Sequence, residues 1–213
     1  MVTHNCGMRL VKTNLTLKEV QPKLKPLVDL LFKRVPAGVG SEGFVELDKK
    51  GMRDVMIDGV KWCVDNGYGW KEDVERTESN GKIDWADPEK VSDKAASRGL
   101  SQIGTLGSGN HYLEIQVVKK HNIADEELAK KFGLFEDQIV VMFHCGSRGF
   151  GHQIGTDYLK IFDQVMPKYG IKVNDRELAC APFSSKEGQD YYKAMACAAN
   201  MAFANRQVIL HRI

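Results

Sequence analysis

The sequence predicts an α+β fold in which mixed sheets are flanked by helices. Several stretches place apolar residues at helical spacing, and the clearest of them covers residues 17–35. Short runs at residues 9–13, 111–118 and 139–143 alternate or are continuously apolar, as strands are. Strands and long helices follow one another without the regular alternation of βαβ units, which favours α+β over a parallel α/β fold.

The first part of the chain predicts a strand, a helix and a loop. Residues 9–13 (RLVKT) form the strand. The amphipathic helix that follows from Thr16 contains Pro22 and Pro26, which we expect in early turns or at a break. Residues 36–43 (PAGVGSEG) combine proline with glycines and predict a loop.

A second amphipathic helix is expected at residues 48–66, where an Asn-Gly pair provides a C-cap. Residues 70–100 are polar and irregular, with a short helix after an Asp-Pro pair, so we expect an exposed excursion there.

The second half predicts two strands and two helices. Residues 111–118 alternate, and residues 139–143 (IVVMF) form a buried strand. A helix that opens at His152 is expected through residues 157–166. The last helix should begin at Ser184, because Glu187 completes a capping box three residues later.

Composition limits the classes of function. The 30 basic and 28 acidic residues leave a net charge of +2, so any polyanion must be bound by a local patch. No apolar run approaches the roughly 20 residues that a membrane span needs, and no signal peptide is recognisable. The five cysteines are odd in number and widely spaced, which predicts free or metal-bound thiols in a reducing, cytoplasmic setting.

Three motifs combine residues that bind metals and anions. Cys6 lies in an Asn-Cys-Gly turn near the start. Asn110 and His111 follow a glycine loop whose backbone N–H groups can approach a phosphate. His144 lies just after the apolar strand, and Arg148 follows it among glycines, where its guanidinium can hold an anionic oxygen bidentately.

Together these motifs predict a catalytic metal site, because its ligands are scattered in sequence and structural zinc modules use close Cys-x-x-Cys pairs. A thiolate with imidazoles favours zinc, and the adjacent arginine and glycines favour a phosphate-bearing substrate. The other histidines and cysteines are interpreted as structural. We expect solvated side chains at His4, His121 and His211, and packed thiols at Cys63, Cys145, Cys180 and Cys197.

The chain resembles the RtcB family of RNA ligases, which act in tRNA splicing and RNA repair. The matching blocks are NCGMRL, GTLGSGNHYLEIQ, HCGSRGFGHQ, VNDRELACAP and EGQDYYKAMACAANMAFANRQ, in family order from one end to the other. The resemblance implies joining of RNA 2′,3′-cyclic phosphate or 3′-phosphate ends to 5′-hydroxyl ends, with GTP and manganese. In that family GTP guanylylates a histidine, GMP passes to the RNA 3′-phosphate, and the 5′-hydroxyl displaces it.

The resemblance also assigns residues. Cys6 would bridge two manganese ions, with His111 on one and His144 on the other. Arg148 would hold an RNA phosphate. Contacts to the guanylate are expected from Asn110, His111, Tyr112, Leu113 and Glu114.

Two departures from the family pattern affect these expectations. Thr3 stands where the family has an aspartate, and a hydroxyl is a poor substitute for a carboxylate on a hard cation. The family's guanylylated histidine and a further metal-binding histidine are expected beyond Ile213, where the chain closes inside a predicted helix. We therefore expect residues 1–213 to be one partial catalytic domain of a longer protein, inactive by itself.

Three alternatives stay open from the sequence. The chain is either a catalytically inactive metal- and RNA-binding remnant or one half of a split ligase that a second chain completes. From the residues alone, a zinc-dependent phosphohydrolase is the third.

Overall fold

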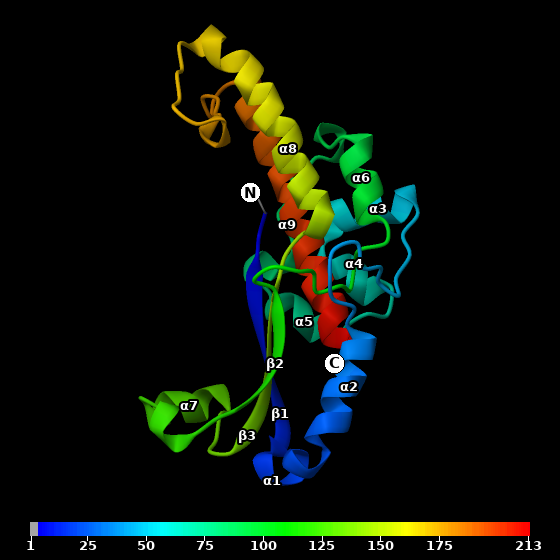
Figure 1. Ribbon diagram of the computed structural model, residues 1–213, viewed down its shortest axis with the longest axis vertical. Coiled ribbons are helices and arrows are strands. Elements are labelled where there is room, and N and C mark those ends of the chain that lie inside the picture. The colour runs from blue at the N-terminus through cyan, green and yellow to red at the C-terminus, as the bar shows by residue number, and fades with distance from the viewer. Residues whose placement is uncertain (1–3) are drawn as a thin grey trace.

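The computed structural model describes residues 4–213, so Thr3 lies outside the described residues. Three strands form one antiparallel sheet in the order β1-β3-β2 (Figure 1). The strands are β1 (Gly7–Thr16), β2 (Tyr112–Val117) and β3 (Gln138–Cys145). All three were expected from the sequence, and helices account for most of the remaining structure, which confirms the α+β class.

The long helix α9 (Lys186–Arg212) lies at the centre of the fold. It packs against α8 (Arg148–Val165) along one side and also contacts β1 and β3 (Figure 1). Alternation along β3 directs Phe143 and Cys145 into a cluster with Ile209 of α9, and both strand residues are fully buried. His144 immediately precedes Cys145 on β3, so its side chain lies on the opposite, open face of the sheet.

Two helical predictions near the start have different outcomes. The helix expected after Thr16 is split, as its prolines suggested, into α1 (Leu17–Val20), a 3-10 turn and α2 (Leu24–Arg34). The single helix expected at residues 48–66 is wrong. It is two helices, α3 (Lys49–Asp58) and α4 (Val60–Asp65), because Gly59 adopts φ +53° against the Gly81 carbonyl.

Residues 70–100 contain α5 (Lys71–Glu75), a 3-10 turn at Pro88–Lys90 and α6 (Asp93–Gly99). α6 packs on α8, and Ala95 of α6 is fully buried. Asn200 of α9 accepts a hydrogen bond from the Ile83 N–H at 2.7 Å, which attaches this segment to the central helix.

One helix and two helix boundaries were missed from the sequence. α7 (Glu126–Phe132), capped by Asp125, had no predicted counterpart. α8 begins at Arg148, four residues before His152, where the helix was expected to open. α9 is capped by Ser185 and not by Ser184, because the Ser185 hydroxyl accepts the Gly188 N–H at 3.0 Å. None of the described helices combines the length and apolar character that a membrane crossing needs.

Candidate metal centre

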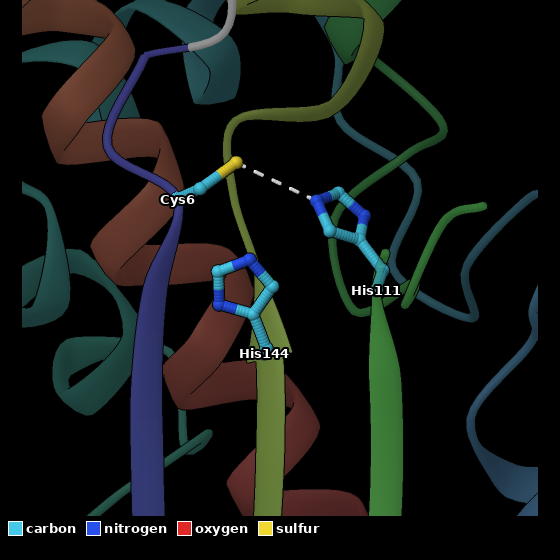
Figure 2. Close-up of side chains that lie close together, drawn as sticks. All are labelled: Cys6, His111 and His144. Carbon is cyan, nitrogen blue, oxygen red and sulfur yellow. Dashed lines mark hydrogen bonds between the residues drawn. The ribbon is translucent and has the colours of Figure 1, made fainter. Parts of the chain in front are cut away.

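Three of the predicted ligands meet at one edge of the sheet. Cys6 directly precedes β1, His111 directly precedes β2, and His144 is the penultimate residue of β3. In an antiparallel sheet the starts of the outer strands lie beside the end of the central strand. The register places His144 opposite both Met8 and Tyr112, so ligands more than a hundred positions apart converge (Figure 2).

The distances fit a divalent cation. The Cys6 Sγ lies 3.5 Å from His111 Nε2, and one donor atom from each of Cys6, His111 and His144 lies within 4.8 Å of the others. A metal bound at ordinary S and N distances separates two such ligand atoms by about 3.1 Å at a right angle and about 3.6 Å at a tetrahedral angle. The observed sulfur–nitrogen distance lies within that interval.

The His111 imidazole is also in a state suited to ligation. Its Nε2 atom faces the Cys6 sulfur, so this ring nitrogen is placed to bind a metal that the two side chains share. Burial lowers the pKa of His111, and the nearby charges of Arg148 and His144 lower that pKa further. A neutral imidazole is the form that binds metals.

A cavity of about 390 Å³ opens beside these ligands. Cys6, Asn110, His111 and Arg148 contribute to its lining, together with Arg98, Gln102 and His152. The cavity joins a thiol and imidazoles on one wall to guanidinium groups on another. This combination suits a substrate that carries phosphate close to a cation.

Arg148 connects two loops across this cavity. Its Nε donates to Thr105 Oγ1 at 2.8 Å, and its Nη2 donates to the Gly38 carbonyl at 3.1 Å. Arg148 has φ +55°, so the backbone turns sharply at the start of α8. Among contacts within the described chain, its Nη1 makes no hydrogen bond, which leaves N–H donors for an anion.

Comparison with known proteins gives the family of this chain. The family model for tRNA-splicing ligase RtcB matches residues 2–213. The chain belongs to the RtcB family. A Pyrococcus furiosus tRNA-splicing ligase RtcB is 58% identical over 211 residues, which is 99% of this chain and 22% of that protein. The Thermococcus kodakarensis protein of the same name is 56% identical over 207 residues, which is 97% of this chain and 42% of that protein. The chain thus spans well under two thirds of these relatives.

The remaining residues assigned by the RtcB resemblance lie on both faces of β2. Tyr112 and Glu114 share the open face with His144, and the Tyr112 ring stacks on the His144 ring at 5.9 Å between centroids. Leu113 packs on the opposite face, with the cluster that contains Phe143. Because side chains alternate along a strand, Tyr112 and Glu114 are on the open face, whereas Leu113 is packed on the other face.

His4 corrects one expectation. It was predicted to be solvated, yet its side chain is only 5% exposed. Its Nδ1 is 3.0 Å from the Gly151 carbonyl, which requires a proton there, so Nε2 accepts from the Tyr191 hydroxyl at 2.9 Å. These bonds anchor the segment before Cys6 between α8 and α9.

Acid should weaken this anchor. Burial lowers the pKa of His4, and the bond to the Gly151 carbonyl opposes that shift only in part. The pKa of His4 is lower in the folded protein than in the unfolded chain, where it is 6.5, so the contribution of His4 to stability is complete above pH 6.5. The free energy of unfolding falls as the pH drops below 6.5 toward the folded-state pKa. We expect the free energy of unfolding to decrease from pH 7.5 to 5, and to decrease less in His4→Gln. Urea titrations at both pH values measure the free energy of unfolding. An equal decrease from pH 7.5 to 5 in the unaltered chain and in His4→Gln would contradict the prediction.

The other cysteines and histidines are mostly as expected. Cys63, Cys145 and Cys197 are buried, and burial raises the pKa of Cys145 to about 12, so its thiol stays protonated. Cys180 is exposed, so its predicted packing is wrong, because it lies in the loop before α9 and not within a helix. His121 and His211 are exposed, as predicted.

Two residues that contact the ligand segments were missed from the sequence. Asn205 and Arg206 of α9 are 0% and 3% exposed and hydrogen-bond to the chain around all three ligands. The available signal was their position, since three consecutive polar residues, Asn205 to Gln207, interrupt an apolar stretch of helix. Polar side chains in such a run must be buried with partners.

Proposed function

We propose that this chain provides the metal-binding and RNA-phosphate-binding part of an RNA ligase that acts in tRNA splicing and RNA repair. The enzyme would join RNA 2′,3′-cyclic phosphate or 3′-phosphate ends to 5′-hydroxyl ends, with GTP and Mn²⁺, in the cytoplasm. The observation that carries the proposal is the convergence of Cys6, His111 and His144 beside a cavity lined by Arg148. The relatives are tRNA-splicing ligases, which supports the same reaction class.

The described side chains suit distinct tasks in this reaction. Cys6, His111 and His144 would hold Mn²⁺. When bound, such a cation supplies neutralisation of the charge on phosphoryl oxygens. Arg148 would orient the 3′-phosphate through its unpaired Nη1 donors, and the Asn110 amide can donate to a further phosphoryl oxygen.

The guanylate would lie over the open face of β2, against Asn110, His111, Tyr112 and Glu114, with Leu113 supporting it from the packed side. In the proposed sequence a histidine outside these 213 residues attacks GTP and releases pyrophosphate. The RNA 3′-phosphate then takes GMP from that histidine, and the 5′-hydroxyl oxygen attacks the phosphate and displaces GMP. A second chain could supply the remaining residues, in which case ligation would require both polypeptides.

The phosphate role of Arg148 has a direct test. We expect the chain with Mn²⁺ to bind an RNA oligonucleotide with a 3′-phosphate at least roughly 10-fold more tightly than the same RNA with a 3′-hydroxyl, because charge-assisted bidentate bonds are strong. Arg148→Ala should remove that preference while leaving affinity for the 3′-hydroxyl RNA nearly unchanged. Fluorescence anisotropy measures both affinities. Equal binding of the two RNA ends by the unaltered chain would refute the proposal.

The same preparation separates the ligase from a zinc-dependent phosphohydrolase. The chain is incubated with GTP, Mn²⁺, 3′-phosphate RNA and 5′-hydroxyl RNA, with and without a second polypeptide that carries the remaining sequence of the Thermococcus relative. A ligated product in either arm supports the ligase. Release of inorganic phosphate with Zn²⁺, without ligation in either arm, would favour the hydrolase.

A further inference from the structure

Arg206 of α9 binds the residue that precedes one predicted metal ligand and the residue that follows another. Its Nη1 donates to the Asn5 carbonyl at 2.8 Å and to the Cys145 carbonyl at 3.1 Å. Its Nη2 donates to the Asn5 side-chain oxygen. Asn5 precedes Cys6, and Cys145 follows His144, so one guanidinium joins the segments that carry the thiol and the central imidazole.

This contact explains the Asn-Cys-Gly motif. Asn5 has φ +52°, a conformation that asparagine tolerates better than most residues, and both of its oxygens accept from Arg206. At Gly7, a Cβ would lie 3.0 Å from the Arg206 guanidinium carbon. The two residues flanking Cys6 are therefore matched to the arginine, and Cys6 is free to face His111.

Asn205 performs the same task for the third ligand segment. Its Oδ1 accepts from the N–H groups of Gly104 and Thr105, at 2.7 Å and 3.1 Å, in the loop that leads to His111. Its Nδ2 donates to the Thr105 carbonyl and to the Gly146 carbonyl, which lies two residues after His144. Neighbouring side chains on one helix thus hold all three ligand segments.

The energetic cost of burying Arg206 favours a role in positioning the ligand segments over a role in stabilising the fold. Arg206 is 3% exposed, and within residues 4–213 its guanidinium forms no ion pair with a carboxylate. Removing such a charge from water is costly, and apolar residues in place of buried ion pairs are often neutral or stabilising. An apolar side chain could not provide the hydrogen bonds to the Asn5 carbonyl, before Cys6, and to the Cys145 carbonyl, after His144.

We propose that Asn205 and Arg206 are positioning residues that hold the segments of Cys6, His111 and His144 together and thereby set the affinity of the centre for divalent cations. The proposal rests on the metal centre of the proposed function and extends it to residues that touch neither metal nor RNA. Mutation of groups that hydrogen-bond to metal ligands and orient them typically lowers metal affinity roughly 10- to 100-fold.

The helix supplies matched controls. Asn200 is equally buried and bonds to Met56 and Ile83, far from the ligands, and Gln207 adjoins Arg206 but bonds to Tyr68 and Asp73. Co²⁺ affinity is measured through thiolate-to-metal charge-transfer absorption in Asn205→Ala, Arg206→Ala, Asn200→Ala and Gln207→Ala. We expect roughly 10- to 100-fold weaker binding in the first two and less than about 3-fold in the controls.

One further variant and one added compound distinguish lost positioning from simple unfolding. Asn5→Gly keeps the backbone conformation and removes only the side-chain acceptor of Arg206, so it should weaken Co²⁺ binding without loss of the fold. Added methylguanidinium should restore part of the affinity of Arg206→Ala, which a merely destabilised protein would not show. Urea unfolding reports the stability of each variant. Equal losses of Co²⁺ affinity in Asn205→Ala and Asn200→Ala would overturn the proposal.

Metal-free crystal structures separate this proposal from the metal centre itself. If the unaltered chain binds no Co²⁺, the proposed metal function fails, whereas the positioning role is still decided by coordinates. The proposal requires the distance from Cys6 Sγ to His111 Nε2 to grow from 3.5 Å by more than about 1 Å in Arg206→Ala. In Gln207→Ala the distance should stay at its original value. An unchanged distance in both variants would overturn it.

Discussion

Gly107→Ala is expected to reduce divalent-cation affinity more than about 100-fold and to remove the preference for 3′-phosphorylated RNA. A Cβ at this position would lie 2.1 Å from the Nη1 atom of Arg148 and 2.4 Å from the Nδ1 atom of His111. Gly107 also has φ +103°, which an alanine rarely adopts. One methyl group therefore displaces the predicted phosphate ligand and a predicted metal ligand together.

Gly109→Ala provides the matched control in the same loop. Gly109 has φ +77°, but a Cβ there would meet nothing within 4 Å. This variant carries backbone strain without a collision, so it should lose stability of order 1 kcal/mol and keep most of its Co²⁺ affinity. Isothermal titration with Co²⁺, alongside urea unfolding, compares the two. Similar metal affinities in the two alanine variants would show that Gly107 does not make room for the site.

This role of Gly107 differs from the one that its sequence suggested. A glycine loop before Asn110 and His111 indicates close approach of backbone N–H groups to a phosphate. In the structure Gly107 also leaves room for the side chains of Arg148 and His111. Gly146 leaves room in the same way, because a Cβ there would lie 2.8 Å from the Cys6 sulfur. The sequence identifies where flexibility is needed, but only tertiary contacts identify which atoms need the space.

The convergence of the three predicted ligands was predictable because its determinants are local. A thiol in a tight turn and imidazoles at strand ends are visible in the sequence, and antiparallel pairing then brings those ends together. The elements around them were less predictable. Gly59 breaks a helix that periodicity predicts as continuous, because the Gly81 carbonyl occupies the space of a side chain. His4 is buried only because α8 and α9 both pack over it.

The contacts of α9 illustrate the same limit. Asn205 and Arg206 bond to residues about 60 to 200 positions earlier in the chain, and no local pattern names such partners. What the sequence does contain is the anomaly of polar residues within an apolar helical run. An anomaly of that kind indicates buried hydrogen bonds without saying to which segment they go.

Cys6→Ala should abolish Co²⁺ charge-transfer absorption and weaken metal binding more than about 100-fold, since it removes a ligand and not only its support. Stability should change little, because Cys6 is exposed and its thiol is not part of the core. Cys145→Ala is the counterpart at the same end of the sheet. Cys145 is fully buried on the opposite face, and burial raises its pKa to about 12, so it does not supply a thiolate at neutral pH.

The two cysteine variants should therefore separate stability from metal affinity. Cys145→Ala loses core contacts and is expected to unfold at lower urea while it retains Co²⁺ binding within about 3-fold. Cys6→Ala should show the reverse pattern. Alkylation of the unaltered chain gives an independent reading, because exposed Cys6 and Cys180 should both react with iodoacetamide. Added Co²⁺ should protect Cys6 alone, and if peptide mass spectrometry found Cys6 and Cys180 equally reactive with Co²⁺ present, the thiol would not be a ligand and the centre would reduce to two imidazoles.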